Sequence, residues 1–444
     1  MSGGPLTPGE EAYPRPLYAW YVIGILLLAY TVAFVDRQIL SLMVQPIRAD
    51  LGLSDTAISL LHGFAFALFY TFMGMYLGRW ADRGNRRTMI VIGMIIWCIA
   101  TMACGLASSF AGLFLARIVV GVGEATLSPA AYSLISDYFA PARRGRAMSV
   151  YTMGVFVGSG LALILGGIAV TATSAEAEVM LPIVGAVRPW QAAFMIVGLP
   201  GLIVAALMAT IREPSRKERA NRGGDIPSIA DTFRFVGSRA TSLLPIVIGF
   251  GVNAILSYGL AAWVPTFFIR VHGWTAGEIA FAYGVILLTA GCAGIMSGGW
   301  LADRMTARGK TDGALRASLF GMACVIPVVP FIGLGPTPFV SLAALAWSSF
   351  FLGVPTGIAP VALHGITPNE YRGQVTALYL FAINLIGLGI GPTLVALATD
   401  HLFGSDLAVG HSLALVAGVA SVVAFAFIAY ARRGYGELVS QMPR

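Results

Sequence analysis

Long apolar runs fill most of this chain and constrain its fold more than any other feature. A helix that crosses a bilayer needs about 20 predominantly apolar residues, and charges, prolines and glycine clusters bound twelve runs of this kind. The runs cover residues 18–44, 57–79, 88–107, 111–137, 147–172, 191–211, 243–269, 278–301, 314–334, 338–364, 375–399 and 409–431. We therefore predict an all-α membrane protein with twelve transmembrane helices.

The composition excludes a soluble fold for most of the chain. Of the 444 residues, 57% are hydrophobic and only 11% are charged, whereas soluble domains are about 25% charged. A cytosolic enzyme, a disulfide-rich secreted module and a disordered scaffold are therefore excluded. The cysteines lie inside apolar runs without metal-ligand spacing, so we expect free buried thiols and no bound metal: Cys98, Cys104, Cys292 and Cys324.

One long polar connection divides the runs into two groups of six. It extends from Arg212 to Arg239, after the sixth run, and holds seven basic and four acidic residues. We expect two six-helix bundles joined by a linker and flanked by two short tails. The expected parts are a tail at 1–17, a bundle at 18–211, a linker at 212–242, a bundle at 243–431 and a tail at 432–444.

The basic residues predict the orientation of the chain. If the amino terminus is cytoplasmic, 23 of the 28 lysines and arginines fall on cytoplasmic segments, and a bias of this kind sets membrane topology. We expect both termini inside the cell and a multi-pass protein of a bacterial inner membrane. The net charge of +7 is then a consequence of topology, so no nucleic-acid partner is needed to explain it.

Short motifs repeat between the two halves. Residues 78–83 (GRWADR) follow the second run and residues 299–304 (GWLADR) follow the eighth, which places Asp82 and Asp303 221 positions apart. Ion pairs around these motifs are candidates for a latch that closes the cytoplasmic side, although topology alone also explains the arginines. The predicted cytoplasmic gate comprises Gly78, Asp82, Arg83, Arg86, Asp137, Arg144 and Asp303.

Four charged residues lie well inside apolar runs: Asp36 and Arg37 in the first, Arg117 and Glu124 in the fourth. Each charge costs about 2.5–3.5 kcal/mol at a helix centre, so partners or a function must compensate. Arg117, Glu124 and Ser128 share one helical face. Arg117 and Glu124 are ~10 Å apart along the axis, so each needs a partner from another helix.

Arg37 is the natural partner of Glu124, whereas Asp36 points about 100° away from Arg37 around the helix. Two interpretations remain: a structural ion-pair cluster, or a site for protons and substrate. The second half has no counterpart to these charges, which favours the functional interpretation.

The second half offers uncharged polar and aromatic groups instead. Asn253, Tyr258 and Trp263 lie in the seventh run, and Tyr379 and Asn384 lie in the eleventh. They form either a wall that binds an amphiphilic molecule or ordinary helix packing.

The repeats and motifs identify the chain as similar to the major facilitator superfamily over its whole length, and within it to the spinster branch of lysolipid transporters. Asn85 stands where most of the superfamily has glycine, and spinster-like proteins tolerate asparagine there. The matching segments are 35–37 (VDR), 81–86 (ADRGNR), 117–125 (RIVVGVGEA), 157–161 (VGSGL), 212–214 (REP) and 263–265 (WVP).

This resemblance implies a fold of two pseudo-symmetric six-helix bundles, a cavity between them and alternating access. It implies proton coupling at Glu124 and Asp36, and substrate contacts from Arg37. We add Arg117 and Ser128 to the expected substrate contacts. The expected cargo is a lysophospholipid or a sphingoid phosphate, with membrane lipids around a monomeric protein, protons as the coupling ion and no other cofactor.

Three alternatives stay open. The first is export of other hydrophobic or cationic compounds by proton antiport. The second is an intramembrane lipid acyltransferase, because His401 and Asp406 match a His-x4-Asp pattern. The third is a receptor that transports nothing.

Overall fold

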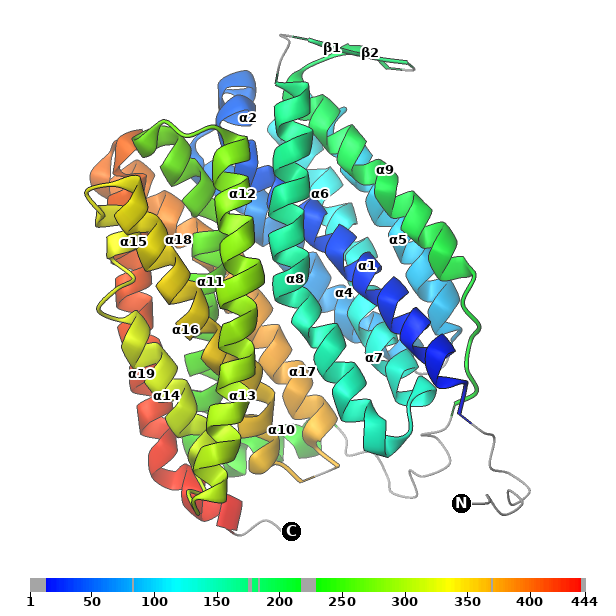
Figure 1. Ribbon diagram of the computed structural model, residues 1–444, viewed down its shortest axis with the longest axis vertical. Coiled ribbons are helices and arrows are strands. Elements are labelled where there is room, and N and C mark those ends of the chain that lie inside the picture. The colour runs from blue at the N-terminus through cyan, green and yellow to red at the C-terminus, as the bar shows by residue number, and fades with distance from the viewer. Residues whose placement is uncertain are drawn as a thin grey trace.

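The computed structural model describes residues 13–81, 84–174, 178–182, 184–216, 229–368 and 370–440. Long helices run side by side and form a single elongated bundle (Figure 1). Within the described residues, eleven helical segments are long and apolar enough to cross a membrane, and Gly313–Val325 is a shorter apolar helix. The predicted all-α membrane fold is confirmed.

The amino-terminal half holds the first six spans. Several spans contain more than one element, because short π-helical turns (η1, η3, η4 and η5) or breaks interrupt them. The elements of this half are α1 (Pro16–Leu42), α2 (Val44–Leu51), α3 (Asp55–Ser59), η1 (Leu60–Phe64), α4 (Ala65–Ala81), α5 (Arg86–Cys104), α6 (Phe110–Glu124), α7 (Leu127–Tyr138), α8 (Pro141–Thr173), β1 (Val179–Leu181), β2 (Gly185–Val187) and α9 (Pro189–Ala209).

The carboxy-terminal half holds the other spans and a short helix that precedes them. Its elements are α10 (Ile229–Ser238), α11 (Ala240–His272), α12 (Ala276–Ile286), η3 (Leu287–Gly291), α13 (Cys292–Ala307), α14 (Gly313–Val325), α15 (Phe331–Leu334), α16 (Pro338–Gly365), α17 (Arg372–Ala382), η4 (Ile383–Ile390), α18 (Gly391–Leu397), η5 (Ala398–Phe403), η6 (Asp406–Ala408) and α19 (Val409–Ser440).

The two ends of the bundle differ, because the described part of the chain starts and finishes at the same end. The terminal end holds the start of α1 and the end of α19, and the distal end is the opposite one (Figure 1). A small hairpin projects from the distal end, where β1 and β2 pair antiparallel with Val179 opposite Val187.

Two spans that the apolar runs predicted as single helices are broken. Residues 111–137 form α6 and α7, with a turn at Ala125 and Thr126. Pro129 has no N–H with which to bond the Ala125 carbonyl, and Thr126 bonds the Gly123 carbonyl through its N–H (3.2 Å) and its hydroxyl (2.8 Å). Residues 314–334 likewise form α14 and the one-turn α15, separated by a segment that contains Pro327 and Pro330.

The predicted linker and tail are also more helical than expected. Helix α10 lies within 212–242, and its Phe235 ring stacks on Tyr371 at a centroid distance of 4.4 Å. Helix α19 continues past residue 431 to Ser440. Charged residues made both segments resemble loops, because the sequence does not show the apolar surfaces on which they pack.

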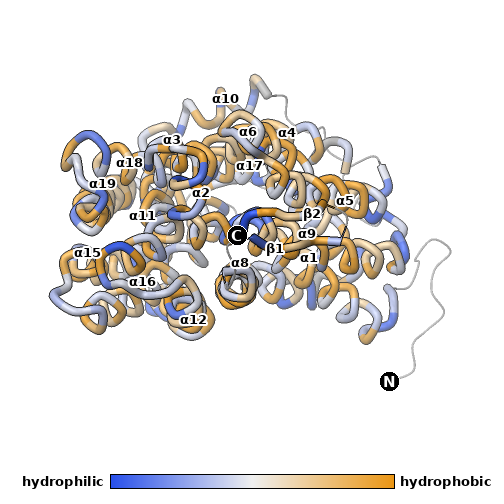
Figure 2. Tube along the Cα trace, turned by 90° about the horizontal axis from the view of Figure 1, so that it is seen from above, coloured by the Kyte–Doolittle hydropathy of each residue, from blue (hydrophilic) through white to orange (hydrophobic). Residues whose placement is uncertain are grey.

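The surface of the bundle is apolar where lipid is expected. Figure 2 shows hydrophobic residues along helices on every side of the bundle, including its periphery. Many large apolar side chains are exposed there, among them Ile168 of α8, Ile203 of α9, Phe320 of α14 and Val419 of α19.

The halves meet closely along α8 and α12. At Gly160 and Gly284 the two backbones approach so closely that a Cβ added to either glycine would lie 2.7 Å from the carbonyl oxygen of the other. Only glycine fits at this crossing. A cavity with lining residues from both halves, Ser159 of α8 and Tyr283 of α12 among them, lies beside this contact.

Candidate substrate and coupling site

Arg37 and Glu124 form an ion pair in the interior of the amino-terminal half, as their chemistry predicted. Arg37 of α1 donates from Nε to Glu124 Oε2 at 2.7 Å, and its Nη2 lies 2.5 Å from the same oxygen. Glu124 is the last residue of α6, and its side chain is fully buried, whereas 14% of the Arg37 side chain is exposed. The other carboxylate oxygen, Glu124 Oε1, has no hydrogen-bond partner in the described structure.

Aromatic rings surround the Arg37 guanidinium. Its Cζ atom lies 4.5 Å from the centroid of Phe66, 5.0 Å from Tyr70 and 5.3 Å from Phe34. The Arg117 guanidinium lies 5.5 Å from the same Phe66 ring, which therefore contacts both cations. Such contacts stabilise a partly desolvated arginine. Sequence reasoning missed these rings, because aromatic residues are common in apolar runs and these carry no distinguishing signal.

Arg117 has partners on other helices, as expected, but they are not carboxylates. Its guanidinium donates to the backbone carbonyls of Leu61 (3.3 Å) and Asp36 (3.1 Å). Arg117 thus ties α6 to the π-helical turn η1 and to α1. The four buried charged residues are therefore not held together by ion pairs alone, because Arg117 bonds to backbone carbonyls.

Asp36 lies apart from the ion pair, in agreement with its predicted direction. Both of its carboxylate oxygens are buried and have no hydrogen-bond partner among the described residues. An ionised carboxylate in such a place costs several kcal/mol, so a neutral, protonated Asp36 is favoured. The buried groups Arg37, Arg117 and Glu124 then carry a net charge of +1, and not the zero expected with both carboxylates ionised.

A cavity of about 170 Å³ lies between the two halves, midway along the helices. Helices α1 and α8 form its wall in the amino-terminal half, and α11, α12, α16 and α17 form the opposite wall. Three of the predicted substrate contacts line it: Asn253, Tyr258 and Tyr379. Polar residues that were not predicted also line it, namely Gln38, Ser159, Ser257, Tyr283, Ser349 and Thr356.

The ion pair adjoins this cavity. Phe34 and Gln38, which flank Arg37 on α1, both line the cavity. Tyr258 on the opposite wall lies within electrostatic reach of Arg37. Arg37 therefore connects the buried Glu124 to the space between the halves.

The other five predicted contacts are not among the lining residues: Arg37 and Arg117 belong to the charged cluster beside the cavity, and Trp263, Asn384 and Ser128 lie elsewhere. Trp263 is fully buried and donates from its indole N–H to the Pro392 carbonyl at 2.9 Å, which joins α11 to α18. Asn384 is half-buried in η4, and Ser128 is half-buried in α7 beyond the break that follows Glu124. The structure places Trp263 in helix packing.

At the terminal end, Arg86 is the centre of a buried polar network. Its guanidinium binds Asp137 of α7, the Ser133 hydroxyl (2.9 Å) and Glu213 (2.7 Å), which follows α9. All these partners belong to the amino-terminal half. Of the predicted gate residues, Asp82 and Arg83 lie outside the described residues.

The remaining predicted gate residues occupy separate places. Gly78 lies in α4 opposite Pro129, since a Cβ added there would be 4.0 Å from the Pro129 Cβ. Arg144 donates to the Ser136 carbonyl at 2.9 Å. Asp303 is exposed near the end of α13.

At the distal end, ion pairs join one half to the other. Asp55 of α3 is fully buried and binds Arg270 of α11 in a two-point contact of 2.5 and 2.6 Å. Arg48 lies 3.2 Å from Asp55 and 2.8 Å from Asp406. Thr56 donates to Asp400 from its N–H and its hydroxyl, both at 2.7 Å. These contacts hold the distal end closed.

Residues 26–392 match the Major Facilitator Superfamily. The chain belongs to this superfamily. It is 28% identical over 418 residues to an MFS-type efflux pump of Mycolicibacterium smegmatis, covering 92% of this chain and 91% of the pump. A hexuronate transporter of Bacillus subtilis is 26% identical over 427 residues (90% and 95%). Human protein spinster homolog 1 is 25% identical over 430 residues (89% and 74%).

Solved structures agree with this assignment. A bacterial homologue of the human lysosomal transporter spinster, in an inward-facing and unoccupied conformation, superposes with a TM-score of 0.77 at 28% identity, over 96% of this chain and 98% of the other. The occupied form of such a homologue gives a TM-score of 0.75 at 27% identity, with the same coverage. The expected similarity to spinster-like transporters is confirmed.

The family makes this protein a multi-pass membrane protein and a secondary transporter, and not an enzyme. The acyltransferase alternative is therefore wrong. Its proposed residues have other surroundings: His401 is exposed, and Asp406 is paired with Arg48.

Proposed function

We propose that this protein is a proton-coupled transporter that moves an amphiphilic molecule with an anionic or zwitterionic head, such as a lysolipid, by alternating access. A single chain is the transporting unit, and the terminal end faces the cytoplasm of a bacterial cell. The observation that carries this proposal is the Arg37–Glu124 pair beside the cavity between the halves.

The geometry of the pair supports coupling between a proton and an anion. Glu124 Oε1 has no partner in the described structure and is available for a proton. Protonation of Glu124 removes the counter-charge of Arg37, whose positive charge then attracts an anionic head. Proton and anion therefore bind with positive coupling, and by linkage a bound anion favours the protonated Glu124 to the same degree.

The lining of the cavity supports an amphiphile. Phe34, Phe156 and Phe250 contribute apolar surface, while Asn253 and Tyr258 offer hydrogen bonds. The volume of about 170 Å³ is below the ~300–1,000 Å³ of pockets for drug-sized ligands, so the cavity must widen to accept a whole lysolipid. Relative movement of the two halves supplies that change.

The ion pairs that close the distal end support an inward-facing conformation, in which the cavity opens toward the cytoplasm. In the proposed orientation, the ion pairs of Asp55 and the contacts of Thr56 shut the outer side. The two similar bacterial structures are also described as inward-facing.

The test is transport by the purified protein in proteoliposomes. We expect lysophosphatidic acid, added under an imposed pH gradient, to move together with protons into an alkaline lumen. A protein that carries the lysolipid without any substrate-dependent proton flux would contradict the proposed coupling.

A second candidate is export of hydrophobic cations by proton antiport, which the 28% identity to the efflux pump favours. A cation would compete with the proton at Glu124, so the substrate and the protons would move in opposite directions. The sign of the proton flux in the same assay separates the two candidates.

A further inference from the structure

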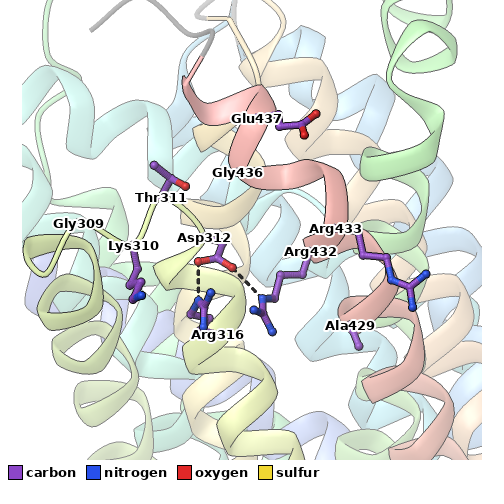
Figure 3. Close-up of a pocket in the computed structure, with 10 residues that line it drawn as sticks. All are labelled: Gly309, Lys310, Thr311, Asp312, Arg316, Ala429, Arg432, Arg433, Gly436 and Glu437. Carbon is purple, nitrogen blue, oxygen red and sulfur yellow. Dashed lines mark hydrogen bonds and ion pairs between the residues drawn. The ribbon is translucent and has the colours of Figure 1, made fainter.

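A second cavity, of about 580 Å³, lies at the terminal end of the carboxy-terminal half (Figure 3). The loop between α13 and α14 forms one side of it, and the last turns of α19 form the other. Its lining includes two carboxylates, Asp312 and Glu437, and four basic side chains. These are Lys310, Arg316, Arg432 and Arg433.

Asp312 fixes two of the arginines in place. Its carboxylate accepts from Arg316 Nε at 2.5 Å and from Arg432 Nε at 2.7 Å, as the dashed lines in Figure 3 show. Burial alone would raise the pKa of the Asp312 carboxyl, but the hydrogen bonds and charges of Arg316 and Arg432 hold its pKa below the usual value. The carboxylate therefore stays ionised and keeps both arginines oriented.

The cavity keeps unused donors. Arg316 and Arg432 each engage Asp312 only through Nε, so their terminal nitrogens have no partner among the described residues. The side chains of Lys310 and Arg433 form no ion pair or hydrogen bond with any residue that the structure describes. With four cations and two carboxylates, the formal charge of the lining is +2. Oriented guanidinium groups with free terminal nitrogens match the oxygens of a phosphate.

An apolar surface continues from this cavity along both helices. Phe320 lies one turn after Arg316 on α14 and is 51% exposed. Val422 lies three turns before Arg433 on the same face of α19 and is 52% exposed. Helices α14 and α19 pack against each other, so the basic cavity lies at the end of an exposed apolar surface. This is the arrangement of a lipid, with a charged head at the interface and chains along the protein.

We propose that this cavity binds the phosphate of an anionic phospholipid from the cytoplasmic leaflet, whose acyl chains lie along Phe320 and Val422. The site is separate from the transport cavity, and the proposal rests on the proposed orientation and not on the proposed substrate. Juxtamembrane basic clusters attract anionic lipids in this way.

The test compares lipid retention by three full-length proteins. The proteins are the wild type, Lys310→Gln/Arg433→Gln and the matched control Arg143→Gln/Arg146→Gln, which removes two exposed charges from the same end of the other half. Lys310 and Arg433 have no partners in the described structure, so their loss leaves the fold intact. Lipid binding is measured by native mass spectrometry after incubation with equal amounts of phosphatidylglycerol and phosphatidylcholine.

We expect the wild type and the control to retain phosphatidylglycerol selectively. The Lys310→Gln/Arg433→Gln protein should bind it about 10- to 30-fold more weakly, as two interfacial charges predict. Equal retention by both double variants would overturn the proposal. A parallel incubation with millimolar inorganic phosphate distinguishes the source of the anion. Complete displacement of the lipid would identify a site for soluble phosphate and refute the lipid assignment, whereas persistence of the lipid would support it.

Discussion

The two halves share a fold but present different chemistry to the cavity between them. The amino-terminal half places Arg37 beside this cavity, between the lining residues Phe34 and Gln38 and paired with the buried Glu124. The carboxy-terminal half supplies Asn253, Tyr258 and Tyr379, which carry no charge. The pseudo-symmetry of the fold therefore does not extend to the chemistry of the two cavity walls. One half recognises charge and protons, and the other shapes the cavity and offers hydrogen bonds.

The two halves also differ in the charged networks at the terminal end, where the central group is a cation in one half and an anion in the other. In the amino-terminal half, the Arg86 cation is held by Asp137 and Glu213. In the carboxy-terminal half, the Asp312 carboxylate is held by Arg316 and Arg432. Each network stabilises the ends of helices within its own half. Among the described residues, Arg86 uses all its guanidinium nitrogens, whereas the terminal nitrogens of Arg316 and Arg432 stay free for an anion.

The largest effect is expected from Glu124→Gln. The amide keeps the volume of the side chain and still accepts a hydrogen bond from Arg37, but it cannot take up a proton. Uphill accumulation under a pH gradient should fall to a ratio of about 1, because the coupling free energy is lost. Proteoliposome uptake measures this, and Glu370→Gln, an exposed carboxylate, is the matched control. Unchanged uphill transport would remove Glu124 from the coupling role.

The next effect is expected from Arg37→Lys. Arg37 uses Nε and Nη2 for Glu124, which leaves Nη1 for a substrate, and a lysine ammonium cannot reproduce this planar arrangement. We expect substrate affinity to fall about 10- to 100-fold, in line with the loss of a charge-assisted contact to an anion. Concentration dependence of uptake measures it, with the exposed Arg304→Lys as control. Full activity of the lysine variant would reduce Arg37 to a simple counter-charge.

Asp55→Asn tests the distal closure that joins the halves. Removing one partner of a buried ion pair costs of order 3 kcal/mol, so we expect the population open at the distal end to rise more than tenfold. Distances between spin labels across the distal end report this population. Asp50→Asn is the control, because Asp50 pairs with Arg188 and accepts from Trp190 within one half. An equal shift in both variants would show that cross-half pairing is not what closes this end.

A smaller effect is expected from a substitution in the cavity wall of the carboxy-terminal half, whose side chains carry no charge. Tyr258→Phe removes one hydroxyl from a residue that lines the cavity within electrostatic reach of Arg37. A single hydrogen bond contributes about 1 kcal/mol, so the apparent affinity should fall roughly fivefold while the proton flux per substrate stays constant. Tyr430→Phe, on the exposed face of α19, is the control. A changed ratio of protons to substrate would mean that the second half also takes part in coupling.

The charged part of this site could be predicted from the sequence, whereas most of the cavity lining could not. The free-energy cost of burying a charge explains the difference. Burying a charge is expensive, so the Arg37–Glu124 pair followed from the runs that hold these residues. Cavity lining involves no such cost. Tyr258 and Trp263 lie on the same helix, yet only Tyr258 lines the cavity, since small differences in packing decide which face of α11 is turned inward.

The helix break in the fourth span and the ion pairs at the distal end could not be predicted from the sequence either. Pro129 accompanies a break in the fourth span, whereas α16, the tenth span, continues through Pro360 without a break. The outcome depends on local contacts such as the Thr126 hydroxyl bond. In the sequence, Arg48 and Arg270 are only two of the basic residues that fall outside the predicted cytoplasmic segments. Their carboxylate partners come from short segments that only the folded chain brings together.

The smallest effect is expected from Asp36→Asn. This variant compares the two buried carboxylates of the amino-terminal half, Asp36 and Glu124. Both Asp36 oxygens are buried without partners in the described structure, so the neutral form of the side chain is favoured in this conformation. Asparagine is neutral and of similar volume, and Arg117 binds the backbone carbonyl of Asp36 and not its carboxylate. We therefore expect uphill transport within about twofold of the wild type, because no charge and little packing change. A loss as severe as that of Glu124→Gln would make Asp36 a second coupling carboxylate, protonated in this conformation and ionised in another.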